Sequence, residues 1–590
     1  MKPTFLLFLC ALSFVLRAQH SPTFDNGVVR FGPVALNEAE KNVLLDGLDA
    51  LNDRYDPAAK MLTRKLNGYN YHTDAESGVF HEVRASFNYA VRLLDLGDER
   101  LRQRAFDIIE ATIALQDTNS TSRYAGVWPY YSEEPLSTKK SPVDFNWADF
   151  NAVSLLDVYM GHYGKLPDGL KRKIINALVL AGKSVQKRNV QPGYTNIAIM
   201  GTYVTFMVSH LFDLKEMQQY SRERLKKFYD YTLERGFTEY NSPTYTIVSL
   251  DELDRMKRHI ADAGAKPMID SLYSLAWEVI AQHFHMPSGQ WAGPHSRSYS
   301  TVTSSSIYGI LKQASGGKID FPGATARADV KIRHKIPDHL LSYFLAPDYP
   351  RTQQDEFAVD PPKVTGTTFL TDRYAFSSAN RSSLWNQRRP LLVYWGKPSR
   401  PNYIQLRFLH DGYDFCSASF YSSQKENRLL GGISFLTNGG DKHINIDRLQ
   451  DGRFSAGDLR MRFEFAHAGQ LQDLHLPRKS NAPFRFETEG LPLQIQLFES
   501  HFDDLKGYWE KGTDGQVAWL DYVIYSGDPR AFDLSSMQRA VLGFSFSIPE
   551  GDEHSHEKPV SSFRGDQLEA TWKDLRLEIP AKPGPQPKNL

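Results

Sequence analysis

A base, a fixed cation and a phenol stand at every second position in the segment WAGPHSRSYS, residues 291–300: His295, Arg297 and Tyr299. In an extended segment, residues two apart point to the same side. In a helical turn, His295 and Tyr299 would still share a face. A Tyr is a poor base at its ordinary pKa of about 10, but a neighbouring Arg lowers that pKa by stabilising the phenolate. The spacing therefore predicts a proton-transfer site, with a structural Arg–Tyr contact as the alternative.

A second polar segment, FTEYNSPTY, follows a predicted helix at residues 237–245. Pro243 fixes a turn, so the segment presents its acid, amide and phenols outside regular structure. These side chains are Glu239, Tyr240, Asn241 and Tyr245. Loops of this composition often carry ligands. The alternative is an Asx-turn in which Asn241 caps the following helix.

Polar residues also stand at the predicted starts of three helices. His81 and Arg84 open the helix in FHEVRASFNYA, where Glu82 also suits the helix dipole. Asn196 lies in the first turn of the apolar helix in PGYTNIAIM, either as a cap or as a binding residue facing a cavity. The segment DFNWADFN carries Trp147 together with Asp144, Asn146, Asp149 and Asn151. Paired carboxylates of this kind could be the machinery of a glycosidase, or they could cap a helix.

Two further groups have a weaker claim to function. His283 and His285 in AQHFHMP form a bare HxH pair at a helix end, which is little evidence for a metal site. Arg388, Arg389 and Trp395 in NQRRPLLVYW could form the lip of a site, although a strand-edge position explains them equally well. The sequence has no HExxH, P-loop, GxSxG or EF-hand motif, which disfavours zincin proteases, nucleotide-dependent enzymes and elbow-type serine hydrolases.

The elements that must position these residues fall into two regions. From about residue 36 to 344, apolar residues recur at spacings of three and four, and Gly or Pro marks many of the breaks. After about residue 347, short runs rich in β-branched and aromatic residues alternate with Gly, Asn and Asp. We therefore expect a multidomain α+β chain: an (α/α) toroid of paired helices at 19–345, in a closed or nearly closed ring, and an antiparallel β-sandwich at 346–580. A flexible Pro-rich tail is expected at 581–590.

The N-terminus predicts export. A Lys precedes an apolar run at residues 5–16, which is too short for a membrane span and typical of a signal peptide cleaved after Ala18. Cys10 lies inside that run, and Leu9 before it disfavours lipoprotein processing. Cys416 then remains alone, so no internal disulfide is expected. The formal net charge of zero argues against nucleic acid as a partner. We expect a periplasmic or extracellular protein that is not inserted in the membrane, and the sequence leaves its oligomeric state open.

The combination of a signal peptide, paired helices, a following β domain and clustered Asn, His, Arg and Tyr resembles the (α/α)-toroid polysaccharide lyases. More narrowly, it is similar to polysaccharide lyase family 27, whose members remove terminal L-rhamnose from glucuronic acid in arabinogalactan glycans. The resemblance covers most of the chain in architecture but is loose in motif, because the spacing and order of these residues are not fixed across the families, so it leaves open which Tyr is the base.

The resemblance implies β-elimination at a uronic acid. His295 and Tyr299 would transfer protons, with Tyr245 as a second acid, and Asn241, Asn196 and Arg297 would neutralise the substrate carboxylate. His81, Arg84, Glu239, Tyr240 and Trp147 would bind the glycan. No cofactor is required, and a structural Ca²⁺ is left open. Two alternatives remain: a toroid glycoside hydrolase that uses Asp144, Asp149 or Glu239, and a non-catalytic glycan-binding protein.

Overall fold

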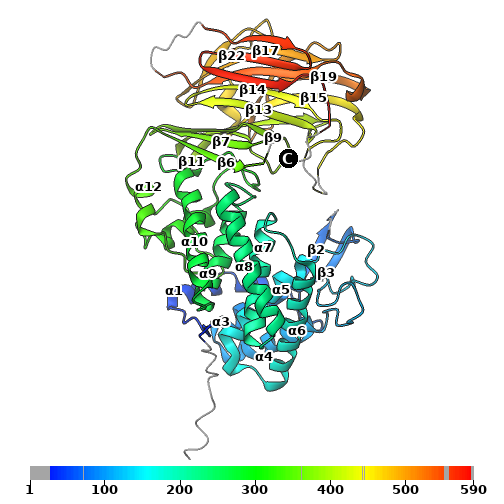
Figure 1. Ribbon diagram of the computed structural model, residues 1–590, viewed down its shortest axis with the longest axis vertical. Coiled ribbons are helices and arrows are strands. Elements are labelled where there is room, and N and C mark those ends of the chain that lie inside the picture. The colour runs from blue at the N-terminus through cyan, green and yellow to red at the C-terminus, as the bar shows by residue number, and fades with distance from the viewer. Residues whose placement is uncertain are drawn as a thin grey trace, which may run out of the picture.

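The computed structural model describes residues 27–68, 70, 72–360, 362–440, 443, 446–550 and 557–585. The predicted signal peptide, with Cys10, lies outside these residues. Helices make up the first part of the described chain and strands the second, and Figure 1 shows the two parts stacked along the long axis of the molecule. Among the described residues, no helix is both long and apolar enough to cross a membrane.

A small antiparallel sheet precedes the main helices. The chain begins with α1 (Glu38–Asp46), which is stabilised by a capping box between Asn37 and Glu40, and continues with α2 (Leu48–Asn52). The sheet consists of β1 (Tyr55–Asp56), β2 (Met61–Asn67) and β3 (Ser77–Glu82). β3 runs directly into the next helix, so this sheet fixes the start of that helix.

Four helical hairpins form the main body of the first domain. The helices are α3 (Val83–Leu96), α4 (Glu99–Ile113), α5 (Asn146–His162), α6 (Asp168–Arg188), α7 (Thr195–Leu211), α8 (Lys215–Arg235), α9 (Tyr245–His259) and α10 (Ala265–His283). The first hairpin shows why the chain turns so tightly. Gly97 adopts a left-handed φ of 74° and closes α3, and Asp98 then caps α4.

The hairpins pack side by side in an arc, with α3, α5, α7 and α9 in contact in that order. Every residue of α7 is buried, whereas α8 buries only one stripe, so the odd-numbered helices are the inner ones. The arc begins with α3 and ends with α9, and residues 328–334 link these two ends. Lys331 Nζ lies 2.9 Å from Asp95 of α3, and Arg258 of α9 donates a hydrogen bond to the Lys331 carbonyl over 2.7 Å. The domain is thus an incomplete (α/α) toroid.

A mixed segment joins the helices to the strands. It holds β4 (Phe284–His285), β5 (Gln290–Trp291), α11 (Ser305–Ala314) and α12 (Ser342–Leu345). β6 then begins at Arg351. The residues after β5 pair with the second domain, because His295 and Arg389 form an antiparallel bridge with backbone hydrogen bonds of 3.0 and 3.1 Å.

The second domain is a sandwich of two antiparallel sheets around a shared apolar core. The first sheet has the order β18-β19-β15-β11-β10-β8-β7-β6, with β12 paired to β11; the second has the order β16-β17-β20-β14-β13-β9. Their strands are β6 (Arg351–Ala358), β7 (Val364–Leu370), β8 (Tyr374–Ala379), β9 (Arg381–Ser383), β10 (Leu391–Lys397), β11 (Arg400–His410), β12 (Tyr413–Asp414), β13 (Ala418–Lys425), β14 (Arg428–Phe435), β15 (Arg453–Phe465), β16 (Phe484–Thr488), β17 (Leu491–Phe502), β18 (Tyr508–Thr513), β19 (Ala518–Asp533) and β20 (Ala540–Ser547).

A third sheet covers the outside of the second one. It consists of β21 (Val560–Arg564), β22 (Gln567–Trp572) and β23 (Leu575–Pro580), and β23 packs on β13 and β14. This covering explains why every residue of β20 is buried. Leu542 faces the sandwich core, while Val541 belongs to a separate apolar cluster beneath the third sheet. The part of the expected flexible tail that is described, residues 581–585, is held against the domain, because Gly584 bridges Leu436 and Ala581 is buried.

Candidate active site

A cavity of about 910 Å³ opens among the inner helices and is bounded in part by the β domain. α3, α5, α7 and α9 line it, together with segment 297–299, segment 328–331 and His443 of the β domain. Its aromatic, amide, cationic and acidic members include His72, Arg84, Asn88, Tyr130, Asp144, Asn146, Trp147, Phe150, Tyr194, Asn196, Tyr245, Arg297 and Tyr299. A cavity of this size that joins aromatic walls to a few polar groups is typical of a ligand site.

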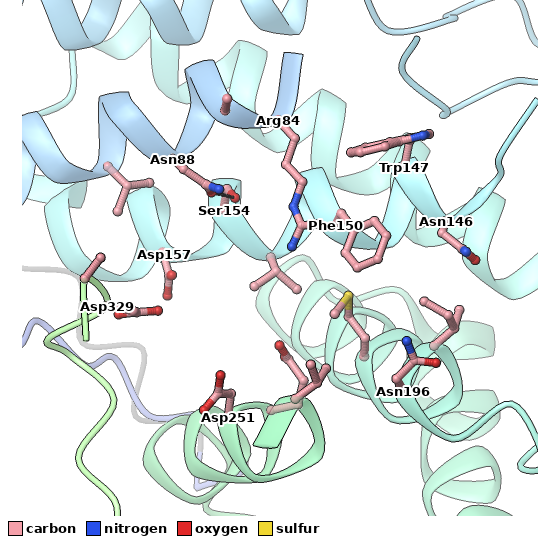
Figure 2. A pocket seen from close by; sticks show the side chains of 18 of the residues that line it. Arg84, Asn88, Asn146, Trp147, Phe150, Ser154, Asp157, Asn196, Asp251 and Asp329 are labelled. Atoms are coloured by element: carbon pink, nitrogen blue, oxygen red, sulfur yellow. Dashed lines mark hydrogen bonds between the residues drawn. The ribbon is translucent and has the colours of Figure 1, made fainter. Parts of the chain in front are cut away.

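The inner helices present their first turns to this cavity. Arg84 is the second residue of α3, Trp147 the second of α5, Asn196 the second of α7 and Tyr245 the first of α9. Figure 2 shows Arg84, Trp147 and Asn196 around the same open space. The amino end of a helix carries a partial positive charge, so four such ends around one space favour an anionic ligand.

Arg84 is the cation best placed to bind such an anion. Its Cζ atom lies 4.0 Å from the centre of the Phe150 ring, and no hydrogen bond or ion pair to another described residue engages its guanidinium. Burial lowers the pKa of Arg84, and the negative charge of Glu252 opposes that shift. A guanidinium keeps its charge in a protein, so Arg84 holds an uncompensated positive charge in the cavity.

Asn196 supplies an unused polar atom nearby. Its side chain is buried, and among the described residues its Oδ1 atom has no hydrogen-bond partner. A buried amide oxygen without a partner costs about 1–3 kcal/mol. Such a cost is expected where a ligand completes the hydrogen bond.

Two phenols and a guanidinium meet on another part of the cavity wall. The Tyr245 and Tyr299 hydroxyl oxygens are 2.8 Å apart, and Arg297 Nη2 donates to the Tyr245 oxygen over 3.2 Å. Burial and the hydrogen bond with Tyr299 raise the pKa of Tyr245, although Arg297 opposes the shift. Tyr245 is therefore protonated and can donate to Tyr299, whose side chain is 62% exposed. Arg297 does lower the pKa of Tyr245, as the sequence led us to expect, but burial raises that pKa by more.

Arg297 is held by several groups at once. Its Nε atom donates to Gln387 of the β domain over 2.8 Å, and its Nη1 atom lies 3.7 Å from the Glu239 carboxylate. Its Cζ atom lies 5.0 Å from the Tyr245 ring centre and 5.4 Å from that of Trp385. Arg297 thus fixes the phenol pair and connects it to the second domain.

His295 and Asn241, both predicted to be catalytic, lie behind this wall and do not line the cavity. The His295 nitrogens face two backbone carbonyls, Nδ1 at 2.6 Å from Asn241 O and Nε2 at 3.1 Å from Trp291 O. Burial lowers the pKa of His295 to about 3. Asn241 donates from Nδ2 to Ala292 O and Pro294 O, over 2.9 and 3.0 Å, and its Oδ1 accepts from Trp291 Nε1 over 2.6 Å. Both side chains hold two loops together.

The other predicted binding residues are dispersed. Glu239 contacts Arg297, and Tyr240 stacks on Phe357 of the β domain with ring centres 3.8 Å apart, but neither lines the cavity. His81 lies on β3, outside the cavity, where its ring nitrogens contact Glu133 and Asp56. Burial lowers the pKa of His81, but the carboxylates of Glu133 and Asp56 raise it by more, so the pKa of His81 is raised overall.

The acids proposed for a hydrolase also separate. Asp144 lines the cavity and accepts a hydrogen bond from the backbone N–H of Asn146, the first residue of α5, over 2.9 Å. Asp149 is sealed between helices outside the cavity, where burial raises its pKa to about 7.

The possible metal and lip residues lie elsewhere. His283 and His285 use both ring nitrogens in contacts with Val279, Asp355, Ser288 and Thr371. Among the described residues, no group of three or more His, Cys, Asp or Glu side chains is arranged to hold a metal ion. Arg388, Arg389 and Trp395 do not line the cavity.

The structure adds residues that the sequence reading missed. His72 and Tyr130 stack with ring centres 4.8 Å apart, and Trp147 meets the Tyr130 ring edge-on at 4.7 Å. His443 reaches the cavity from the β domain and stacks on Trp385 at 5.4 Å. His72 and His443 lie in irregular segments without a motif, so no periodic signal could have identified them.

A paired-helix arc followed by an antiparallel sandwich, with a polar cavity bounded by both, defines the architectural class of this chain. The structure of this chain is loosely similar to those of several solved lyases. The chondroitin AC lyase of Streptomyces coelicolor A3 has a TM-score of 0.49 and 10% identity, covering 92% of this chain and 85% of that one. The heparan sulfate lyase HepC of Pedobacter heparinus has a TM-score of 0.40 and 8% identity, covering 92% and 90%. A heparinase III has a TM-score of 0.38 and 9% identity, covering 97% and 94%.

A family model described as a domain of unknown function, DUF8769, matches residues 41–332, a range that contains all four helical hairpins. No curated protein matches the chain.

Proposed function

We propose that this protein is a polysaccharide lyase that cleaves the bond at C4 of a uronic acid by β-elimination. The observation that carries the proposal is the placement of Arg84 in the same cavity as the Tyr245–Tyr299 pair. Arg84 packs on the Phe150 ring and has no hydrogen-bond or ion-pair partner among the described residues. A uronic acid needs both features: a group that neutralises its carboxylate, and a group that removes the proton beside it.

Arg84 and Asn196 would bind the carboxylate. A guanidinium binds a carboxylate in two parallel hydrogen bonds, and the amide adds a further polar contact. These contacts strengthen as negative charge moves from C5 onto the carboxylate in the transition state. The Trp147, Phe150 and Tyr130 rings give the cavity wall apolar surface against which a sugar could pack. Asn241 and Arg297, which were expected to share this task, are occupied by other contacts.

Tyr299 would take the C5 proton. The hydroxyls of Tyr245 and Tyr299 are hydrogen-bonded to each other, so Tyr245 would donate to Tyr299 in the step that removes the proton, and Arg297 supplies positive charge to the pair. As the C5–H and C4–O4 bonds break, the C4–C5 double bond forms, and a phenol of the pair returns a proton to O4. Of His295 and Tyr299, the geometry favours Tyr299, because His295 does not reach the cavity.

The substrate we propose is the L-rhamnose-α-1,4-D-glucuronate end of arabinogalactan-type glycans. The support for this choice is the resemblance of the sequence to polysaccharide lyase family 27. The Arg84 guanidinium beside Asn196 suits one uronate next to a sugar without a carboxylate.

A glycoside hydrolase is the second candidate, favoured by Glu252. This residue lines the cavity, and burial raises its pKa to about 7, as expected of a general acid. Asp144 is the acid of the earlier hydrolase hypothesis that also lines the cavity.

One assay separates the candidates. The protein is incubated with gum arabic and with glucuronate, galacturonate and iduronate glycans, and absorbance in the near ultraviolet is followed. A lyase produces a conjugated double bond that absorbs, whereas a hydrolase releases sugar without absorbance. A glycan-binding protein releases no sugar and forms no absorbing product. Absence of absorbing product from every substrate would refute the lyase proposal.

A further inference from the structure

Arg84 and Tyr130 reach the cavity from two segments whose backbones are paired just outside it. β3 ends two residues before Arg84. Segment 130–133 runs antiparallel beside that end, where the backbone N–H of Val83 donates to the Tyr130 carbonyl over 3.2 Å. A shift of segment 130–133 against β3 would therefore displace both cavity residues.

His81 fixes one face of β3 to this segment. The His81 carbonyl accepts from Ser132 N over 3.1 Å, and the His81 backbone N–H donates to a Glu133 carboxylate oxygen over 3.1 Å. The ring lies between two carboxylates, with Nδ1 against Glu133 and Nε2 3.1 Å from Asp56 of β1. The ring thus joins β1, β3 and segment 130–133. We call His81, Asp56 and Glu133 the histidine clamp.

A second set of charges fixes the opposite face of the strand. Neighbouring residues of a strand point to opposite sides, so Glu82 faces away from the histidine clamp. Its carboxylate lies 2.6 Å from Arg54 and 2.9 Å from Arg64 of β2. An arginine keeps its charge in a protein, whereas a histidine changes its charge near neutral pH. The two faces therefore respond differently to pH.

The surroundings of the His81 ring favour its charged form. An imidazolium donates from both nitrogens and can satisfy both carboxylates, whereas a neutral ring donates from only one. Burial lowers the pKa of His81, but Glu133 and Asp56 raise it by more. The other titratable or charged side chains on the elements packed around the ring are Tyr55 of β1, Lys65 and Arg64 of β2, Arg54, Glu82 and Tyr131.

We propose that His81 is a positioning residue for the ligand site at Arg84. While its ring is charged, the histidine clamp holds segment 130–133 against β3 and keeps Arg84 and Tyr130 directed into the cavity. Loss of the proton leaves a ring nitrogen with its lone pair facing a carboxylate, so segment 130–133 loosens and ligand binding weakens. The inference rests on the proposed function in one respect: the ligand at Arg84 is a uronate.

The direction of the pH dependence follows from the raised pKa of His81. Because this pKa is higher in the folded chain than the ordinary value of about 6.5, the stabilisation by the clamp is fully present below about pH 6.5. It is lost as the pH rises through the folded-state pKa. The Glu82 pairs on the other face keep β3 in its sheet, so the expected change is confined to segment 130–133 and the start of α3.

The first experiment measures the clamp without a ligand. Hydrogen exchange of wild type and of His81→Arg, whose charge does not titrate, is followed by mass spectrometry at about pH 6 and about pH 8.5. At the higher pH we expect peptides containing residues 79–84 and 130–133 to be less protected in wild type than in His81→Arg. Peptides of the β domain should be equally protected in both. Equal protection of the two segments in both proteins at the higher pH would overturn the clamp.

The second experiment measures binding of methyl glucuronoside, a uronate with no sugar on O4 to release. By calorimetry we expect wild type to bind it about three- to tenfold more weakly at about pH 8.5 than at about pH 6, as for loss of one hydrogen bond. His81→Gln should bind weakly at both pH values, and His81→Arg should restore tight binding at both. His501→Gln, which removes a His–Glu pair of β17, is the matched control and should keep the wild-type pH dependence.

The outcomes separate the two proposals. If exchange shows release of the clamp but methyl glucuronoside binds at neither pH, the proposed function loses its ligand and the clamp stands. If wild type and His81→Gln bind the glucuronoside equally at both pH values, His81 does not position the site and the lyase proposal stands. Thermal unfolding checks each variant; if His81→Arg does not fold, the absence of pH dependence in His81→Gln remains the test.

Discussion

The hydroxyl oxygens of Tyr245 and Tyr299 lie 2.8 Å apart although 54 positions separate the residues in sequence. Tyr245 opens α9, and Tyr299 lies in the segment that follows β5 and pairs with the β domain. Arg297 also donates a hydrogen bond to the Tyr245 oxygen. Two phenols beside a fixed cation can share a proton and pass it on, which neither phenol could do as readily alone.

Tyr299→Phe removes one hydroxyl and leaves the ring in place. If Tyr299 takes the proton, we expect kcat for formation of unsaturated product to fall by about 10²–10⁴-fold, the usual contribution of a general base. Tyr245→Phe should also lower kcat, because it removes the hydrogen bond that favours the Tyr299 phenolate. Tyr508→Phe, at an exposed position of the β domain, is the control and should match wild type. Full activity of Tyr299→Phe would remove this residue from the mechanism.

Arg84→Met should separate activity from stability. The substitution removes a desolvated charge that has no ion-pair partner among the described residues, so the melting temperature should stay the same or rise. The value of kcat/KM should fall by about 10²–10³-fold, as expected for loss of a group that stabilises developing charge. Arg100→Met, at an exposed ion pair on α4, controls for loss of an arginine. A variant that unfolds readily but retains kcat/KM would assign Arg84 a structural role instead.

Asn241→Ala should be costly to the fold. The substitution removes two hydrogen bonds to carbonyls and leaves Trp291 Nε1 without its acceptor. Asn241 also has a left-handed φ of 41°, which Asn tolerates better than Ala. We expect the free energy of unfolding, measured by urea titration, to fall by about 2–4 kcal/mol. Asn386→Ala, at an exposed position, should change it little, and an equally small effect at Asn241 would mean that the two loops are held by other contacts.

Sequence periodicity predicted many of the helices and strands because those elements bury one face, whereas α7 and β20 are buried on all sides. The 3.6-residue repeat located the hairpins, and runs of β-branched residues located the sandwich. The residues that line the cavity follow no such repeat in the sequence. Arg84 and Asn196 were noticed as residues of helix starts, which is where they lie, but convergence of those starts depends on how the hairpins pack.

Because sequence spacing does not show how segments bend and pack, it also gave the wrong position for His295 and did not identify His443. Every-second-residue spacing put His295 on one face with Arg297 and Tyr299, yet the segment bends after the bridge to Arg389, so His295 turns inward while Tyr299 is exposed. Spacing alone carries no information about such a bend. His443 could not be found from local sequence at all, because it reaches the cavity only when the two domains pack.

His295→Gln tests the inward orientation through pH. The pKa of His295 is about 3 in the folded chain, against an ordinary value of about 6.5 when unfolded. Between these values the unfolded chain binds a proton that the folded chain does not. Stability must therefore fall as pH decreases below about 6.5, by on the order of 1.4 kcal/mol per pH unit. The variant lacks this group, so its loss of stability between pH 7.5 and 5.5, measured by urea unfolding, should be smaller than that of wild type.

Activity supplies the deciding comparison for His295. A side chain that only joins two loops should, when replaced, lower stability and leave the kcat of the folded fraction within a few-fold of wild type. If His295→Gln instead abolished the unsaturated product while retaining wild-type stability and pH dependence of unfolding, His295 would be the base. Tyr299 would then have to act as the acid that protonates O4.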